Sequence, residues 1–319
     1  MLAKFRTQGY NGYGVQWSPF FENKLAVASS ANYGLVGNGR LFILNTAVGP
    51  AGINVERVYD TQDGLFDITW SEVNENQLVT ASGDGSIKLW DATLGDFPIQ
   101  NWQEHTREVF SVHWNLVNKD TFVSGSWDHS IKLWNPQAPH SLQTYKEHTH
   151  CVYSTQWSPH SGTLFASASG DQLVKIWDTK SPRSVQTVRA HNNEILSLDW
   201  NKYTEHTIVT GSVDHTVKVW DLRHLDRELV CLRGHEYAVR KVKCSPHQGN
   251  IVASAGYDMS VRVWDVAAPG EMKMVELHDL HTEFVLGVDF NLYIEGQIAT
   301  CAWDEMVHVF VPPALVPRR

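Results

Sequence analysis

The sequence is organised by one short phrase that returns at an almost constant interval. The phrase runs Asp, two variable residues, Val or Ile, Lys or Arg, an apolar residue, Trp, and Asp or Asn, and its clear copies span 84–91, 128–135, 171–178, 214–221 and 258–265. Their tryptophans, Trp90, Trp134, Trp177, Trp220 and Trp264, lie 44, 43, 43 and 44 residues apart. Degenerate copies at 38–45 and 304–311 bring the total to seven units. A period of this length is typical of one supersecondary unit per repeat.

A second marker, a histidine nine residues before an aromatic residue or a cysteine, accompanies the phrase in five units. The histidines are His105, His148, His191, His235 and His281, whereas Gln8 and Thr61 take this place in the first two units. Between the markers, apolar and polar residues alternate in short β-branched runs bounded by Gly, Asn, Asp and Pro, which indicates strands and turns. Four strands fit in each period of about 43 residues. The pattern predicts an all-β propeller with seven blades.

The two markers resemble those of the WD-repeat family along essentially the whole chain. The resemblance implies a single seven-bladed WD40 β-propeller over 1–311, with repeats at approximately 8–45, 61–91, 105–135, 148–178, 191–221, 235–265 and 281–311. Pro312 and Pro313 interrupt the chain soon after Phe310, so the last blade lacks an outer strand. We expect residues 3–7 to supply that strand and close the ring, which removes an exposed sheet edge. Residues 312–319 are expected to form a tail, and its LVPRR ending resembles a protease-site remnant of an expression tag.

Composition excludes several classes of protein. Asp plus Glu number 35 against 26 Lys plus Arg, and the chain has no basic block, which argues against nucleic-acid or anionic-membrane binding. The four cysteines lie far apart without metal-ligand spacing, which favours a reducing compartment and predicts neither metal nor cofactor. No apolar run approaches the roughly 20 residues that span a bilayer. We therefore expect a soluble, intracellular protein that does not insert into membranes.

A serine or threonine, a histidine and an aspartate recur together and invite comparison with a hydrolase triad. A nucleophile is needed once, whereas this set returns five times in register, so we interpret it as scaffold and expect no enzymatic activity. The predicted chain links carboxylate, imidazole and hydroxyl, and the indole N–H finds an acceptor inside the blade. Its members are His105, Ser124, Asp128 and Trp134, then His148, Ser167, Asp171 and Trp177, then His191, Thr210, Asp214 and Trp220, then His235, Ser254, Asp258 and Trp264, with His281, Thr300 and Asp304 in the last unit.

In WD-repeat proteins the top face is commonly formed by three positions of each blade, which lie three and five residues after the histidine and one residue before the turn aspartate. The first ring is Asn11, Gly64, Glu108, Cys151, Glu194, Ala238 and Phe284. The second ring is Tyr13, Phe66, Phe110, Tyr153, Leu196, Arg240 and Leu286. The third ring is Gly37, Gly83, Trp127, Gly170, Val213, Tyr257 and Trp303. Exposed aromatic residues clustered around isolated carboxylates predict a protein or peptide site. The alternative is that some of these side chains only pack between blades.

Several stretches resemble one branch of the WD-repeat family, the receptors for the type 2 peroxisomal targeting signal. They are 11–45, 63–72, 104–115, 123–136, 166–178 and 281–290, and the likeness runs from about residue 9 to 310. The irregular first unit carries YGLVGNGRLFIL where a generic repeat has its Asp and Trp markers. The resemblance implies a receptor that cycles between the cytoplasm and the peroxisome matrix with cargo such as thiolase, an import co-receptor and a docking complex at the peroxisomal membrane.

Such a receptor would bind an N-terminal amphipathic helix of the form Arg/Lys-Leu-x5-His/Gln-Leu on the top face. The cation of this helix needs an acidic partner, and its apolar side needs a groove. We expect Glu108 and Glu194 to be the carboxylates. The other expected contacts are Phe66, Phe110, Trp127, Tyr153, Arg240, Tyr257, Phe284 and Trp303.

Two other functions remain open at this point. The stretch VWDLRH at 219–224 contains a Trp-Asp-x-Arg box of the kind that WD-repeat adaptors present to a ubiquitin ligase, although the box also arises as ordinary turn chemistry. A generic scaffold is the other alternative. A propeller hydrolase has no unrepeated nucleophile or metal set to support it. His129 and His215, which follow turn aspartates, are expected in solvated loops without a chemical role.

Overall fold

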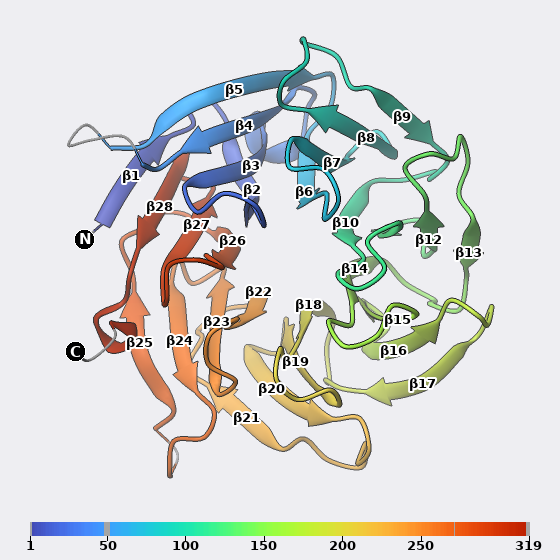
Figure 1. Ribbon diagram of the computed structural model, residues 1–319. Helices are drawn as coiled ribbons and strands as arrows, with labels where there is room; N and C mark the ends of the chain where they lie inside the picture. Colours follow the sequence, from blue (N-terminus) through green and yellow to red (C-terminus); the bar gives the residue numbers. More distant parts are fainter. Residues whose placement is uncertain (1, 48–51, 271, 317–319) are drawn as a thin grey trace.

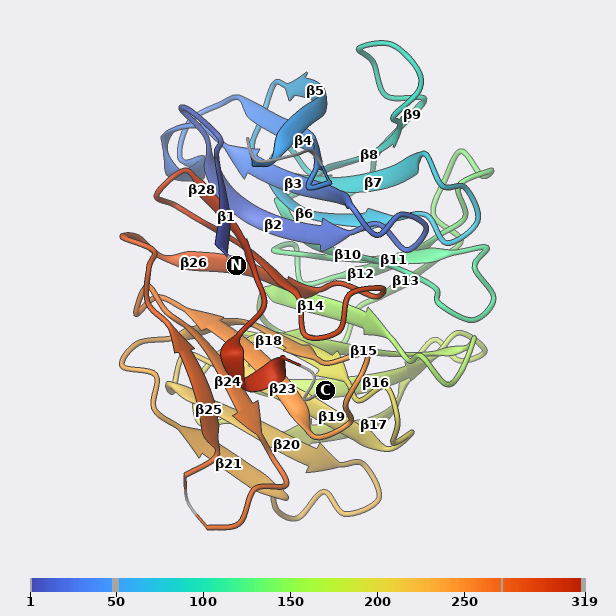
Figure 2. The ribbon, with the colours of Figure 1, turned by 60° about the vertical axis from the view of Figure 1, so that its left-hand side comes forward.

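Seven four-stranded antiparallel sheets surround a central channel in the computed structural model, which describes residues 2–47, 52–270 and 272–316. Figure 1 looks along the axis of the ring, and Figure 2 shows the blades from the side. Blades 1 to 6 are β2–β5, β6–β9, β10–β13, β14–β17, β18–β21 and β22–β25. Blade 7 combines β26, β27 and β28 with β1 from the other end of the chain. The predicted seven-bladed propeller is confirmed.

The described strands of the first half of the ring are short and begin with the closing strand. They are β1 (Leu2–Arg6), β2 (Asn11–Trp17), β3 (Lys24–Ser30), β4 (Gly39–Asn45), β5 (Asn54–Thr61), β6 (Leu65–Trp70), β7 (Gln77–Ser82), β8 (Ser86–Asp91), β9 (Gln100–Gln103), β10 (Val109–Trp114), β11 (Phe122–Ser126), β12 (Ile131–Trp134) and β13 (Gln143–Tyr145).

The second half repeats the same order from the inner to the outer strand. Its strands are β14 (Val152–Trp157), β15 (Leu164–Ser169), β16 (Leu173–Asp178), β17 (Ser184–Arg189), β18 (Ile195–Trp200), β19 (Thr207–Ser212), β20 (Thr216–Asp221), β21 (Val230–Arg233), β22 (Val239–Cys244), β23 (Ile251–Gly256), β24 (Val261–Asp265), β25 (Met274–His278), β26 (Val285–Phe290), β27 (Ile298–Ala302) and β28 (Met306–Phe310).

The described helices are two 3₁₀ turns, η1 (Asn32–Gly34) and η2 (Pro313–Leu315). Within 2–47, 52–270 and 272–316, no helix has the length and apolar character needed to cross a membrane. Leu315 belongs to the predicted tail, but it is buried against blade 7 in a cluster with Ile298 and Phe310. Part of the tail therefore packs on the propeller, whereas residues 317–319 of the LVPRR stretch lie outside the described residues.

Closure of the ring depends on β1, which pairs antiparallel with β28 over its whole length. Arg6 forms an ion pair with Glu305 at 3.1 Å, and the backbone N–H of Thr7 donates to the carbonyl oxygen of Glu305. The two ends of the chain thus complete one sheet, as Figure 1 shows on the left of the ring. The expected closing strand at 3–7 is confirmed at 2–6, and it covers the outer edge of β28.

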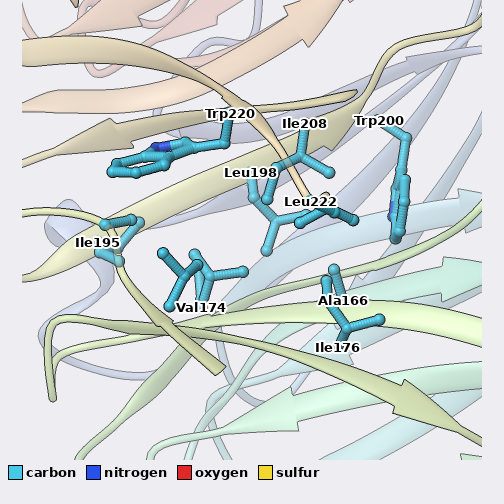
Figure 3. Close-up of a cluster of buried hydrophobic side chains, with 12 residues drawn as sticks. Ala166, Val174, Ile176, Ile195, Leu198, Trp200, Ile208, Trp220 and Leu222 are labelled. Atoms are coloured by element: carbon cyan, nitrogen blue, oxygen red, sulfur yellow. The ribbon is translucent and has the colours of Figure 1, made fainter. Parts of the chain in front are cut away.

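Apolar residues fill the space between neighbouring blades because successive side chains of a strand point to opposite faces of the sheet. Figure 3 shows this between blades 4 and 5, where Val174 and Ile176 of β16 face Leu198 of β18 and Ile208 of β19. Trp200 and Trp220 close the same cluster, and each is at most 3% exposed. Sheets that pack face to face in this way hold the ring together through burial of apolar surface.

The inner strands pair with a strand on one side only, so side chains complete the hydrogen bonding of their free N–H groups. In five blades the backbone N–H of the aromatic residue or cysteine that lies nine positions after the histidine position donates to a side chain on the inner strand of the preceding blade. The pairs are Trp17 to Asp289 (2.9 Å), Trp70 to Gln16 (2.8 Å), Trp114 to Thr69 (3.1 Å), Trp157 to His113 (3.0 Å) and Cys244 to Asp199 (2.8 Å). Because buried N–H groups need an acceptor, each blade depends on its neighbour.

A histidine pair distinguishes the place where the ring closes. His278 on β25 and His308 on β28 lie with Nε2 and Nδ1 3.0 Å apart and share a hydrogen bond. Burial lowers the pKa of His278 to about 4 and that of His308 to about 3, and electrostatic interaction with His281 and Lys4 lowers both further. The carboxylates of Asp279 and Asp304 oppose the shift. Both imidazoles are therefore neutral at pH 7.

Acidification from about pH 7 to about pH 4.5 should lower the melting temperature. In the unfolded chain these imidazoles take up protons near pH 6.5, whereas in the folded chain His278 stays neutral down to about pH 4. The unfolded state therefore binds more protons in this window, and the free energy of unfolding rises with pH. His278→Leu, which copies Leu232 at the same register of the preceding blade, should flatten the dependence. Calorimetric melts at several pH values test this, with His206→Gln at an exposed histidine as control. Identical slopes for His278→Leu and the unsubstituted protein would contradict it.

Candidate functional site

The repeated Ser, His and Asp residues form buried hydrogen-bonded chains inside the blades. In blade 3, Nδ1 of His105 lies 2.8 Å from Oδ2 of Asp128, and Nε2 lies 2.8 Å from Oγ of Ser124. The indole Nε1–H of Trp134 donates to the same Oγ at 2.8 Å. This pattern fits an imidazole that donates from Nδ1 to the carboxylate and accepts the hydroxyl proton of Ser124 at Nε2.

Four further blades repeat the chain with nearly the same distances. For each blade we give the His to Asp, the His to hydroxyl and the Trp to hydroxyl distance, in that order. They are 2.7, 2.7 and 2.8 Å in blade 4 (His148, Asp171, Ser167 and Trp177). They are 2.9, 2.7 and 3.3 Å in blade 5 (His191, Asp214, Thr210 and Trp220) and 2.8, 2.6 and 2.8 Å in blade 6 (His235, Asp258, Ser254 and Trp264). His281 contacts Asp304 at 2.9 Å and Thr300 at 2.8 Å. Phe310 stands in the tryptophan position there and has no N–H to donate.

These chains cannot work as nucleophile sites. Ser124 is fully buried, and its Oγ also accepts the indole N–H of Trp134, so a substrate has no access to this hydroxyl. Burial tends to raise the pKa of Asp128, but the hydrogen bonds from His105 and Ser130 outweigh it and hold the pKa well below its usual range. His129 and His215 lie exposed at positive φ in the turns beside their aspartates. The geometry serves the scaffold, since it fixes the loop histidine to the turn.

The top mouth of the channel is shaped by a bulge at the start of every inner strand. In each blade the pairing of the inner strand skips one residue, and that residue belongs to the second ring named above. A bulge turns the side chain of its extra residue away from the regular faces of the sheet. The seven residues so placed are Tyr13, Phe66, Phe110, Tyr153, Leu196, Arg240 and Leu286.

The first and third rings are tied together by backbone hydrogen bonds in six blades. The N–H of the third-ring residue donates to the carbonyl oxygen of the first-ring residue, for example from Trp127 to Glu108 (3.0 Å) and from Val213 to Glu194 (3.0 Å). Equivalent bonds join Gly83 to Gly64, Gly170 to Cys151, Tyr257 to Ala238 and Trp303 to Phe284. The three rings therefore lie at fixed positions around the mouth.

Seven aromatic side chains in contact with one another form an arc around part of this mouth. Trp127 stacks on Phe110 with ring centroids 4.7 Å apart, and Phe110 stacks on Phe66 at 4.5 Å. The arc continues from Phe66 to Tyr13, Trp303, Phe284 and Tyr257 at 4.9, 5.8, 5.3 and 4.8 Å. We call these seven residues the aromatic arc. It runs from blade 3 through blades 2, 1 and 7 to blade 6.

Two of the predicted contacts are almost fully buried, in line with the alternative that some of these side chains pack between blades. Phe66 and Arg240 are each only 5% exposed. Phe66 is covered because its ring lies between those of Tyr13 and Phe110. The guanidinium of Arg240 lies 5.9 Å from the ring of Phe110 and donates to the carbonyl oxygen of Leu196. These two side chains form the floor of the site, while Phe110, Trp127, Tyr153, Tyr257, Phe284 and Trp303 are half-buried at its surface.

Glu108 and Glu194 lie half-buried on the first ring, two blades apart. The carboxylate of Glu194 accepts a hydrogen bond from the hydroxyl of Tyr153 at 2.8 Å. Burial raises the pKa of Tyr153, and the hydrogen bond and charge of Glu194 raise it further, so the phenol keeps its proton. Together with Tyr153, the two glutamates form an acidic sector in the part of the mouth that the aromatic arc leaves open.

Tyr33 is an aromatic residue near the arc that the repeat pattern did not predict as part of the site. Tyr33 is 48% exposed, its ring lies 5.4 Å from that of Trp303, and its carbonyl oxygen accepts the hydroxyl of Tyr13 at 2.7 Å. Leu35 and Val36 follow it and are 83% and 70% exposed. The irregular first unit was a signal that this loop is special, but the exposure of its residues cannot be deduced from the repeat because no other blade has the loop.

The Trp-Asp-x-Arg box lies at the end of β20. Arg223 is 64% exposed, and its Nε and Nη2 donate to Oδ1 and Oδ2 of Asp221 at 2.9 and 2.7 Å. Hydrogen bonds from Arg223 also hold the pKa of Asp221 well below its usual range. The guanidinium fork is thus engaged by its own turn, which agrees with a structural role of the box.

One group of the described side chains has the donor atoms of a metal site. Nitrogens of His278, His281 and His308 lie within 4.8 Å of one another. Both nitrogens of His281 are already bonded, to Asp304 and Thr300, so the blade network would have to break before His281 could bind a metal. Two donors remain, whereas zinc sites use three or four protein ligands. The group is therefore better described as a packed histidine cluster.

Comparison with known proteins gives matches over nearly the whole chain. The family model described as "WD domain, G-beta repeat" matches residues 56–91, 97–135, 139–178, 182–221 and 227–265. A Dictyostelium discoideum protein named "Peroxisomal targeting signal 2 receptor" is 58% identical over 90% of this chain and 91% of its own length. The Arabidopsis thaliana "Peroxisome biogenesis protein 7" is 54% identical over 94% and 95% of the two chains. The Homo sapiens "Peroxisomal targeting signal 2 receptor" is 46% identical over 89% and 87%.

Asp128→Ala should reduce thermal stability before it affects any binding at the top face. The change leaves the buried Nδ1–H of His105 without its acceptor, and an unpaired buried donor costs about 1–3 kcal/mol. Calorimetry should show a lower melting temperature, while Asp226→Ala, at an exposed loop aspartate, should leave it unchanged. Asp171→Ala should behave like Asp128→Ala. If binding disappeared at an unchanged melting temperature, the scaffold role would be wrong.

Proposed function

The chain belongs to the family of peroxisomal targeting signal 2 receptors within the WD-repeat proteins, and we propose that it binds the type 2 signal of matrix proteins on the top face of the propeller. The membership carries the class of function, a receptor in peroxisomal targeting. The location of the site and the residues that form it are our proposal. It is supported by the aromatic arc and the acidic sector, which lie side by side at one end of the channel.

The proposed ligand has the form Arg/Lys-Leu-x5-His/Gln-Leu and binds as a helix. With 3.6 residues per turn, positions 1, 2, 8 and 9 of such a peptide fall on one face, because the seven-residue separation corresponds to about two turns. Nine helical residues span about 13 Å. A helix of this size presents two leucines and a cation together, which suits a surface with apolar and acidic parts.

The aromatic arc supplies the apolar part of the proposed site. Its surface residues Trp127, Phe110, Trp303, Phe284 and Tyr257 are half-buried, so their exposed edges can cover leucine side chains while their rings stay fixed by stacking. Rigid aromatic side chains lose little entropy on binding and are frequent at hot spots of interfaces. Phe66 and Arg240 support this surface from below rather than touching the peptide broadly.

The acidic sector supplies the charge that the leading Arg or Lys of the signal requires. Glu108 and Glu194 are half-buried, so their charges are less screened by water than those of a fully exposed carboxylate. An arginine between them would form charge-assisted hydrogen bonds. The carboxylates would thereby fix the register of the helix, and the arc would provide most of the affinity.

The wider cycle is part of the same proposal. The receptor collects matrix proteins such as thiolase in the cytoplasm, acts with a co-receptor that contacts both propeller and peptide, and meets a docking complex at the peroxisomal membrane before it returns. The exposed Tyr33, Leu35 and Val36 lie beside the arc and extend the apolar surface that a second protein could cover.

Glu108→Arg should weaken binding of the signal peptide by more than tenfold, because it places a like charge against the leading arginine. A peptide whose leading Arg is replaced by Glu should regain part of the affinity for this variant. Fluorescence anisotropy with labelled peptides measures both effects.

The matched control is Glu75→Arg, which makes the same change of charge in the exposed loop between β6 and β7, at the other end of the inner strands. It should leave peptide affinity unaltered, and both variants should keep the melting temperature of the unsubstituted protein. Unaltered affinity in Glu108→Arg would exclude this placement of the signal.

A further inference from the structure

The two glutamates of the acidic sector occupy equivalent positions but have different neighbours. By register, the second-ring residue of the preceding blade is Phe66 for Glu108 and Tyr153 for Glu194. The tyrosine has a hydroxyl that reaches Oε2 of Glu194 at 2.8 Å. Within residues 2–47, 52–270 and 272–316, no group donates a hydrogen bond to the carboxylate of Glu108. The two equivalent positions therefore allow a comparison between a carboxylate that accepts a hydrogen bond, Glu194, and one that accepts none from the described residues, Glu108.

Tyr153 is itself fixed in place. It is the extra residue of the bulge between Val152 and Ser154, so its side chain leaves the blade towards the mouth. Its ring meets those of Phe110 and Trp127 edge-on, at 83° and 87° with centroids 6.2 Å apart. The ring thus lies against the end of the aromatic arc, and its hydroxyl points away to the next blade.

Glu194 is also fixed at its backbone. Its carbonyl oxygen accepts the N–H of Val213 at 3.0 Å and the hydroxyl of Ser212 at 2.8 Å. With Oε2 held by Tyr153, backbone and carboxylate are both anchored, while Oε1 accepts no hydrogen bond from the described residues. A long acidic side chain normally loses rotamer freedom when it binds a cation, and this loss has already occurred here.

We infer that Tyr153 is a positioning residue that holds Glu194 as the fixed anchor for the leading cation of the signal, with Oε1 of Glu194 facing that cation. The inference rests on the proposed function and sharpens it, because it separates the roles of the two carboxylates. Glu194 anchors the cation in a defined place, and Glu108 adds negative charge from a carboxylate that no described group holds by a hydrogen bond. Tyr153, expected from the sequence to be an apolar contact, acts through Glu194 instead.

The inference also gives the peptide a direction. Its leading Arg or Lys lies over blades 4 and 5, next to Tyr153 and Glu194, because the anchored carboxylate is there. The aromatic arc begins at Trp127 and Phe110 and leads through blades 2 and 1, so the helix and its second leucine extend over the arc in that order.

The test is Tyr153→Phe, which removes the hydroxyl and reproduces the environment of Glu108. Two synthetic peptides are titrated by fluorescence anisotropy, one with the leading Arg and a twin with norleucine, which is similar in length but uncharged. Tyr153→Phe should weaken the Arg peptide about fivefold, since it removes one hydrogen bond to the anchoring carboxylate. The norleucine peptide should change less than about twofold, because its binding does not use the charge.

A double-mutant cycle completes the test. Glu194→Gln removes the charge of the anchor, and in that background Tyr153→Phe should cause no additional selective loss for the Arg peptide. Equal losses for both peptides would show that Tyr153 is only an apolar contact, and undiminished affinity for the Arg peptide would show that the hydroxyl is not needed. Either result overturns the positioning role but leaves the proposed function standing. Failure of the unsubstituted protein to bind the Arg peptide would overturn both.

Discussion

The free edge of the inner strand is the constraint on which the rest of the propeller depends. Each inner strand pairs with one strand only, and its remaining N–H groups face the next blade. Acceptors such as Asp289 for Trp17 and His113 for Trp157 come from the preceding blade. His113 can accept because burial lowers its pKa well below the usual value and keeps it neutral. At this position five blades take an acceptor from a neighbour, so the blades depend on one another, and the closing strand β1 completes the ring that they form.

The same inner strand connects the scaffold to the site. Its lower part is bound to the neighbouring blade, whereas its upper end carries the bulge that turns one residue per blade towards the mouth. The buried chain around His105 and Asp128 fixes the loop before the strand, and the bond from Trp127 to Glu108 fixes the turn beside it. A repeated scaffold therefore presents unrepeated residues at defined points.

Much of this could be predicted because the repeat is regular. The spacing of Trp90, Trp134 and their counterparts defines the blades, and a missing outer strand after Phe310 requires β1. The three rings could also be placed by counting from the histidines. The exposure of the ring residues could not be predicted, because it depends on contacts between blades. Phe66, for example, is covered by residues from two other repeats. The Tyr153 to Glu194 bond and the histidine pair likewise join different repeats, so no single unit contains the information.

The stacking of the arc has a consequence for how a short peptide can bind at all. A signal segment that is unstructured before binding loses entropy when it forms a helix, and this opposes association. The receptor cannot remove this entropic cost, but it adds little to it if its own contacting side chains are already ordered. Rings such as Phe110, held between Trp127 and Phe66, do not need to be ordered on binding, and neither does the carboxylate that Tyr153 holds. If the proposed peptide binds here, a surface fixed in advance leaves the ordering of the peptide as the main entropic cost of association.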